Sequence, residues 1–408
     1  PQPRWSRSAP RSSAAPGAAS LWRTLHPVSS SPADWPAPPP EAQARSAELL
    51  AQLREEAVRA GGAISFRRFM EAALYAPGLG YYSGGAAKLG PAGDFVTAPE
   101  LSPLFGRCLA RQALAALEAI GGGAVLELGG GSGALAEAAL AEAGAGLRWL
   151  MLEPSPELRQ RQQQRLGARA EWLDTLPTDF LGVILANEVA DALPVERFTV
   201  SDDGLRQLGV RFDKSGAPGW ATLPPPPELA AAVQALEAER GEPFPPGYTS
   251  EFSPLLQPWV RSLADSLAAG LLLVIDYGLP RRELYAPERS MGTLMCHYRH
   301  RAHDDPFLWP GLQDLTAWVD FTTIAAAGVD AGLTLEGYTT QAAFLAGNGL
   351  EELLAAAPDQ TASIMQAQQA RQLLLPGEMG ERFRVLGLSR GLDPALAGFG
   401  LLDLANRL

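Results

Sequence analysis

The sequence predicts an α/β fold in which a mostly parallel sheet is covered by helices on both faces. Three apolar segments with the length of buried strands, at 124–128, 148–153 and 182–186, are separated by segments with helical patterns. Strands that alternate with helices pair in parallel, because each helix returns the chain to the same edge of the sheet. Hydrophobic residues make up 47% of the 408 residues, which is enough to bury a sizeable core.

Composition narrows the choice of partners and of cellular compartment. The formal net charge of −12 argues against nucleic acid or an anionic membrane as the main partner, and it suits a cationic substrate. The longest strongly apolar run, at 267–275, is about half the length of a membrane-spanning helix, so we expect no membrane insertion. The two cysteines, Cys108 and Cys296, are far apart, which predicts a reducing compartment without a disulfide framework or a zinc site.

Residues 1–45 are predicted to be a disordered N-terminal extension. Serine, alanine and proline are abundant there, and no acidic residue occurs before Asp34. Such a composition cannot bury a core. Its arginines and its lack of acids also fit an organelle transit peptide, and the alternative, which we favour, is an extension from a misplaced start site.

Residues 46–120 are predicted to form an N-terminal helical segment that caps the sheet. A first helix begins near residue 46, and a second contains Phe66 and its apolar neighbours. A glycine-rich loop at 77–93 then leads to a helix at 102–120.

The rest of the chain divides into two parts of a ligand-binding sheet domain and an insertion between them. Residues 121–204 hold the first three strands, and 266–408 hold the remainder of the domain. The segment 205–265 breaks the alternation with a predicted hairpin, a helix near 228–240 and several prolines, so we interpret it as an insertion. The later strands are expected at 271–275, 333–338 and 383–388, with helices around 341–372 between the last two.

A glycine-rich turn after the first strand is the strongest chemical signal. Gly129, Gly131 and Gly133 connect that strand to a helix, and such a turn lets a ligand approach the backbone and the free N–H groups of the helix N-terminus. Glu153 ends the next strand, 26 residues after Glu127, where a carboxylate can accept hydrogen bonds from both hydroxyls of a ribose. The two features in register favour a nucleoside-type ligand over a plain connection with a surface glutamate.

A second signal follows the strand at 182–186. Glu188 and Asp191 are three residues apart, so they could share one face of a helical turn and hold a cationic group. Acids in a first helical turn are also favoured by the helix dipole, and these residues alone leave both explanations open. Asp276 ends a later strand in the same way.

The histidines at 297, 300 and 303 do not predict a metal site. Their spacing would spread them widely around a helix, and it matches no known ligand motif.

Several motifs in order give the chain a resemblance to a known family. It is similar to the MidA-type S-adenosylmethionine-dependent methyltransferases, whose mitochondrial members include the complex I assembly-factor arginine methyltransferase. The resemblance covers nearly everything after residue 46. It departs from the family at Gly130, where proline is usual, and at Val189-Ala190, where bulkier residues are usual. The motifs that carry it include Gly80-Tyr81-Tyr82, the stretch GDFVTAPELSPLFG at 93–106, Asn187-Glu188 with Asp191-Ala192-Leu193-Pro194, Asp276-Tyr277-Gly278, Asp314-Leu315-Thr316, Val319-Asp320-Phe321 and Met379-Gly380-Glu381-Arg382-Phe383.

The resemblance implies a class I methyltransferase fold. This is a Rossmann-like seven-stranded sheet whose last strand is antiparallel, here with an N-terminal helical segment and an inserted substrate or lid region. It implies S-adenosylmethionine as the cofactor and Glu188 and Asp191 as catalytic residues, with Asp276 and Asp320 behind them. The cofactor-binding residues that it implies are Thr97, Glu100, Glu127, Gly129, Gly131, Gly133, Glu153, Ser155 and Asn187.

From this resemblance we expect methyl transfer to arginine of a partner protein, with a respiratory complex I-like subunit as a candidate. A nicotinamide-binding oxidoreductase is a first alternative, which the G-x-G-x-G spacing disfavours because the dinucleotide fingerprint is G-x-G-x-x-G. A non-catalytic assembly factor that retains the fold is a second. We expect the bacterial cytoplasm as the location, or the mitochondrial matrix or another organelle if the N-terminal extension is a transit peptide.

Overall fold

The computed structural model describes residues 35–84, 97–393 and 396–408. The expected disorder of the N-terminal extension therefore lies, for residues 1–34, outside the described residues. Residues 40–45 belong to α2 (Pro40–Arg59), the first helix of the described residues, although we expected them in the extension.

The main sheet confirms the predicted α/β class. In the described part of the chain it has eight strands, one more than expected, because the short strand β14 (Val319–Asp320) pairs with β10 beside the main path. Strands β10, β5, β2, β3 and β4 are parallel, and β16 is antiparallel to both of its neighbours. The path runs through β15 (Thr334–Thr340), β16 (Phe383–Arg390), β10 (Leu267–Leu279), β5 (Phe180–Asn187), β2 (Ala124–Leu128), β3 (Arg148–Leu152) and β4 (Glu171–Leu173).

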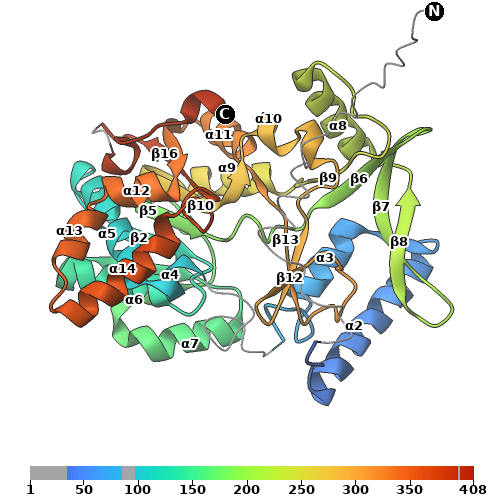
Figure 1. Cartoon of the computed structure of the whole chain (residues 1–408), viewed down its shortest axis with the longest axis horizontal. Helices are drawn as coiled ribbons and strands as arrows, with labels where there is room; N and C mark the ends of the chain where they lie inside the picture. Colours follow the sequence, from blue (N-terminus) through green and yellow to red (C-terminus); the bar gives the residue numbers. More distant parts are fainter. Residues whose placement is uncertain (1–34, 85–96, 394–395) are drawn as a thin grey trace, which may run out of the picture.

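Helices cover both faces of this sheet (Figure 1). Because side chains alternate along a strand, Val183 of β5 packs on one face and Ile184 on the other. On the face of Val183 lie α5 (Pro103–Ala119), α6 (Ala134–Ala143), α12 (Gln341–Gly347), α13 (Leu350–Ala355) and α14 (Gln360–Leu374). On the face of Ile184 lie α9 (Leu256–Ser266) and α11 (Phe321–Asp330).

A second, antiparallel sheet lies to the right in Figure 1, packed against α2 and α3 (Phe66–Tyr75). Its strands come from three of the segments predicted from the sequence, so the segment 205–265 is not a self-contained insertion. α9 at its end packs on the main sheet instead. The strands are β1 (Ala63–Ser65), β7 (Gly204–Phe212), β6 (Glu196–Ser201) and β9 (Thr249–Phe252) in that order, with β8 (Pro218–Leu223) paired to β7, and α8 (Pro227–Arg240) follows β8.

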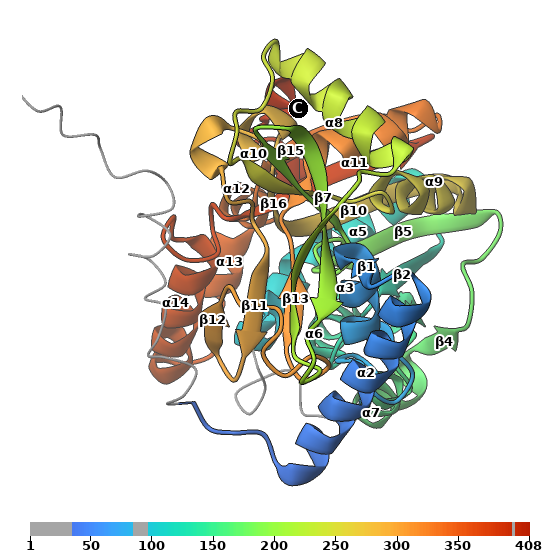
Figure 2. The same ribbon diagram turned by 90° about the vertical axis from the view of Figure 1, so that its right-hand side faces the viewer.

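A small third sheet lies between these two parts (Figures 1 and 2). It consists of β12 (Arg301–His303), β11 (Met295–Tyr298) and β13 (Asp314–Thr316). The start of the described chain is fixed against it. The Trp35 ring stacks on Tyr298 with a centroid distance of 6.5 Å, and the Tyr298 hydroxyl donates to the carbonyl oxygen of Pro36 at 3.2 Å.

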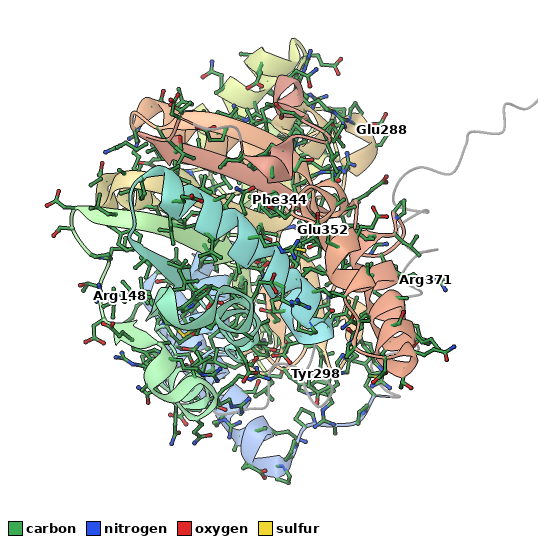
Figure 3. The ribbon with its side chains drawn as sticks, turned by 90° about the vertical axis from the view of Figure 1, so that its left-hand side faces the viewer. Arg148, Glu288, Tyr298, Phe344, Glu352 and Arg371 are labelled. Carbon is green, nitrogen blue, oxygen red and sulfur yellow. The ribbon has the colours of Figure 1, made fainter. Side chains whose placement is uncertain are left out.

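Several charged side chains lie at the outer surface (Figure 3). Figure 3 shows Arg148, Glu288 and Arg371 at the periphery, whereas Phe344 lies in the interior and is buried. None of the described helices is long and apolar enough to cross a membrane. The described residues also contain no group of three or more histidine, cysteine, aspartate or glutamate side chains that could hold a metal ion.

Candidate functional site

A cavity of about 610 Å³ opens at the carboxyl ends of β2, β3 and β5. This volume falls in the range of about 300–1,000 Å³ that is typical of small-ligand sites, and open α/β sheets bind ligands at this edge. Gly133 and Ser155 do not line the cavity. The predicted site residues that do are Thr97, Glu100, Glu127, Gly129, Gly131, Glu153, Asn187, Glu188 and Asp191.

The glycine-rich turn brings bare backbone to the cavity wall. Gly129, Gly131 and Gly133 have φ angles of 58°, 55° and 82°, in the left-handed region that favours glycine. At Gly130 a β-carbon would lie 2.3 Å from the terminal methyl carbon of Met151, so a side chain there would displace its neighbour. Gly133 precedes the first residue of α6 and so fixes the start of that helix instead of touching the cavity.

Glu153 is held in place by two hydrogen bonds from α7 (Pro156–Leu166) and the turn before it. The backbone N–H of Ser155 donates to Oε1 at 2.9 Å, and Gln162 Nε2 donates to Oε2 at 2.9 Å. The same Gln162 nitrogen reaches the carbonyl oxygen of Gly131 at 2.9 Å. Gln162 therefore connects the strand-end carboxylate to the glycine turn.

Gln162 was not predicted as a site residue, although its spacing in the sequence is a usable signal. Leu158, Gln162 and Leu166 recur at four-residue spacing and are all buried on one face of α7. A glutamine at that spacing among apolar residues needs internal hydrogen-bond partners. Its place in the glutamine-rich stretch 160–164 hid this pattern.

Ser155 has a different place from the one we expected. Its hydroxyl caps the N-terminus of α7, accepting from the Leu158 N–H at 3.4 Å. It also donates to the carbonyl oxygen of Tyr82 at 2.6 Å. Ser155 thus connects the turn after β3 to the N-terminal segment and lies behind the cavity wall.

Glu127 lies in β2 next to the glycine turn and is buried. Its Oε2 accepts a hydrogen bond from Trp149 Nε1 at 2.9 Å. Burial raises the pKa of Glu127 to about 8, and the nearby charge of Glu153 acts in the same direction. The carboxyl is therefore mostly protonated at neutral pH.

The short helix α4 (Ala98–Leu101) closes the cavity over the glycine turn. Thr97 precedes this helix, and Glu100 within it accepts a hydrogen bond from the Ser132 hydroxyl. Arg165 donates to the same hydroxyl at 2.5 Å and lies 3.7 Å from Glu100. These contacts join the N-terminal segment to the turn.

At the other end of the cavity, Asn187 and Glu188 follow each other at the end of β5. Glu188 has a φ of 53°, which is uncommon for a residue other than glycine, and its N–H donates to the carbonyl oxygen of Ile275 at 2.9 Å. Asn187 Nδ2 donates to Glu188 Oε1 at 3.2 Å. The buried Asn187 Oδ1 has no hydrogen-bond partner among the described residues, so a polar ligand would satisfy it.

Burial raises the pKa values of both predicted catalytic acids. Burial, followed by the charge of Asp191, raises the pKa of Glu188 to about 8. Burial also raises the pKa of Asp191 to about 6, although a hydrogen bond from the Tyr277 hydroxyl opposes this shift.

The two carboxylates that we expected behind them have structural partners instead. Asp276 is fully buried and accepts from the N–H groups of Ala190 at 3.0 Å and Asp191 at 3.2 Å, so it shapes the turn that carries the predicted catalytic acids. Asp320 caps α11 and pairs with Arg281 at 2.9 Å. Neither residue lines the cavity.

Three further side chains, to which the sequence analysis had assigned no role, line the end of the cavity near Glu188. The rings of Tyr75 and Tyr82 stack at 5.6 Å with an interplanar angle of 20°. The Tyr82 hydroxyl donates to Asp314 Oδ1 at 3.1 Å, and the Tyr75 hydroxyl donates to the Ala192 carbonyl oxygen at 2.8 Å. Tyr82 and Asp314 both occur in motifs that carry the family resemblance, which was the available signal.

Comparison with known proteins identifies the family. A family model described as S-adenosyl-L-methionine-dependent methyltransferase matches residues 108–339, more than half of the chain. The chain belongs to this family. A Burkholderia thailandensis protein solved with bound S-adenosyl-homocysteine shares 44% sequence identity and a TM-score of 0.87, covering 92% of this chain and 100% of that one. The family match and this bound S-adenosyl-homocysteine set aside the alternative of a nicotinamide-binding oxidoreductase.

The names of more distant relatives specify the amino acid that those proteins methylate. The mitochondrial protein arginine methyltransferase NDUFAF7 of Danio rerio is 29% identical, over 80% of this chain and 83% of its own length. The Drosophila melanogaster homolog is 27% identical, over 91% of this chain and 92% of its own length.

The cavity suits S-adenosylmethionine by its own chemistry. It offers a strand-end carboxylate at Glu153, open backbone at the glycine turn, and an unsatisfied amide oxygen at Asn187. Polar groups of these kinds are available in the cavity to a ligand that combines a ribose with a charged amino acid portion.

Proposed function

We propose that this methyltransferase transfers a methyl group to an arginine side chain of a partner protein. The observation that carries this proposal is the acidic, aromatic end of the cavity. Glu188 and Asp191 line it together with the rings of Tyr75 and Tyr82. Carboxylates bind guanidinium groups through paired, charge-assisted hydrogen bonds, and aromatic faces attract the same cation.

The cofactor would lie along the rest of the cavity. Glu153 would accept hydrogen bonds from the ribose hydroxyls, and the turn of Gly129 and Gly131 would receive the methionine portion, covered by Thr97 and Glu100. Asn187 would face the sulfur from the end of β5. When bound, the cofactor supplies an electrophilic methyl group on a positively charged sulfur.

The protein's main contribution would be alignment of donor and acceptor, which can supply several kcal/mol of a barrier of this kind. A guanidino nitrogen gains the methyl group as the carbon–sulfur bond breaks, and the same nitrogen loses one proton. Glu188, with Asp191 beside it, would orient the guanidinium and receive that proton when its carboxylate is ionised.

The relatives support an arginine acceptor because two of them are named protein arginine methyltransferases. Those relatives are also named mitochondrial, which agrees with the organelle alternative for this chain. A respiratory complex I-like subunit remains our candidate partner. The bacterial cytoplasm remains the other location that we propose.

Labelled methyl transfer tests the proposal. Purified protein is incubated with S-adenosylmethionine labelled in the methyl group and with a cell lysate, and labelled proteins are hydrolysed to identify the modified amino acid. We expect label in methylarginine. Label in another amino acid would overturn the arginine assignment, and no transfer by a protein that still binds the cofactor would favour the non-catalytic assembly factor.

A further inference from the structure

We propose that Asp314 is an acceptor-binding carboxylate and that Tyr82 is the positioning residue that fixes it. Recognition of the acceptor cation is then shared between the methyltransferase sheet, which carries Glu188, and the β11–β13 sheet, which carries Asp314. This inference rests on the proposed function, because it takes the acceptor to be a cation.

The small sheet directs Asp314 into the cavity. Asp314 is the first residue of β13, its side chain is buried and it lines the cavity. The next residue, Leu315, is completely buried in the cluster formed by α2, α3 and the second sheet. Since adjacent side chains in a strand point to opposite faces, the packing of Leu315 fixes the direction of Asp314.

Asp314 and Glu188 act on the same space. The charge of Asp314 is one of the influences that raise the pKa of Glu188, and it also raises that of Tyr75. Two carboxylates that approach one site from separate elements can engage different N–H groups of a planar guanidinium. A compact ammonium group offers no such planar set of donors.

Tyr82 is held at both of its ends. Its hydroxyl donates to Asp314, and its ring stacks on Tyr75. Its carbonyl oxygen accepts from the Ser155 hydroxyl at 2.6 Å, and its N–H donates to the Leu74 carbonyl oxygen at 2.8 Å. Because the backbone and the ring are both fixed, the phenol group holds the Asp314 carboxylate in one orientation.

The same contacts connect the acceptor end to the cofactor end. The Ser155 N–H donates to Glu153, and its hydroxyl donates to Tyr82, whose phenol donates to Asp314. Three hydrogen bonds thus lead from the carboxylate proposed for the ribose to the carboxylate proposed for the acceptor. The acceptor carboxylate is placed relative to the cofactor by this connection.

Two variants separate the charge of Asp314 from its hydrogen bond. Asp314→Asn removes the charge but keeps an oxygen that can accept from Tyr82. Tyr82→Phe removes the hydroxyl but keeps the ring that stacks on Tyr75. Asp304→Asn is the matched control, because Asp304 follows β12 of the same small sheet and is exposed.

The measurements are the initial rate of labelled methyl transfer against lysate concentration, the affinity for S-adenosylhomocysteine by calorimetry, and the melting temperature. We expect Asp314→Asn to lower the transfer rate at limiting lysate by about ten- to a hundredfold, the usual effect of losing a charged hydrogen-bond partner. Tyr82→Phe should lower it less. Cofactor-product affinity and melting temperature should stay at the level of the Asp304→Asn control.

Three results would overturn the inference. One is transfer by Asp314→Asn that equals the Asp304→Asn control. The second is an equal loss of S-adenosylhomocysteine affinity, which would place Asp314 at the cofactor. The third is a rate loss that follows a lowered melting temperature, which would make its role structural. Failure of the wild-type protein to transfer methyl groups would instead refute the proposed function, so the two failures are distinguishable.

Discussion

At the scale of single residues, the site contains two carboxylates, Glu153 and Glu188, whose surroundings differ. Glu153 receives hydrogen bonds from Ser155 and Gln162, so its position is fixed before any ligand arrives. Glu188 is enclosed beside other acids, and its pKa is raised to about 8. A hydrogen-bond acceptor in a fixed position suits neutral ribose hydroxyls. The ionised form of a group of enclosed acids is stabilised when a cation enters.

Glu153→Ala tests the ribose assignment. The ribose hydroxyls would lose a charged acceptor, so the affinity for S-adenosylhomocysteine should weaken by about 1–3 kcal/mol. Calorimetry measures the change, with Glu171→Ala as the control because Glu171 forms an exposed pair with Arg148. Equal affinity in the two variants would remove Glu153 from the cofactor site.

The raised pKa of Glu188 predicts the direction of the pH dependence. Below about pH 8 the carboxyl of the free enzyme is mostly protonated and cannot receive the acceptor's proton, and above it the carboxylate is available. The value of kcat/KM, which reports on the free enzyme, should therefore rise with pH and level off above about 8. A profile that falls over this range would contradict the role given to Glu188.

At the scale of elements, the sequence predicted what local patterns and chain alternation determine. Apolar runs located β2, β3, β5 and β10, and the glycine turn located the start of α6. The hairpin predicted within 205–265 is present as β7 and β8. The sheet that contains it was missed because β1 joins it by a pairing that is not local, between Ala63 of β1 and Arg211 of β7. No periodicity within either segment reports such a partner.

The same limit applies to the candidate site. Glycine and acid motifs at strand ends pointed to residues that line one cavity. Asp314 could be assigned no role, because it reaches the cavity from the β11–β13 sheet, which only the folded chain places there. Ser155 was assigned to the cofactor, although its contacts make it a helix cap and a connection to Tyr82.

Ser155→Ala tests whether Ser155 caps α7 instead of contacting the cofactor. Loss of a helix cap usually lowers the free energy of unfolding by about 1 kcal/mol, and the lost bond to Tyr82 should add to this. Urea denaturation measures the loss. A variant with unchanged stability but much weaker binding of S-adenosylhomocysteine would show that Ser155 contacts the cofactor after all.

At the scale of the whole molecule, the start of the described chain is part of the packed structure. Trp35 is 6% exposed and lies against Tyr298 and His303 of the small sheet. Ser46 of α2 donates to the Pro310 carbonyl oxygen at 2.8 Å. The segment that follows residue 34 therefore helps to hold the sheet that presents Asp314.

Two truncations distinguish the stability that the Trp35 contact contributes from any contribution of residues 1–34. Removal of residues 1–45 would take away Trp35 and the first residues of α2, and it should lower the melting temperature relative to removal of 1–34. Trp35→Ala in the full chain should lower the unfolding free energy by about 3 kcal/mol, as for other buried aromatic residues. Equal melting temperatures for the two truncated proteins would show that the Trp35 contact adds no stability.

The central claim is that the acidic end of the cavity acts on a cationic acceptor, and Glu188→Gln tests it most directly. Glutamine keeps the shape and the oxygen that accepts from Asn187, but it removes the charge and the proton acceptor. On one purified variant, methyl transfer per folded molecule should fall by about a hundredfold, while S-adenosylhomocysteine affinity stays within about threefold of wild type. Glu171→Gln should change neither quantity. Full transfer activity with normal cofactor affinity in Glu188→Gln would contradict the claim.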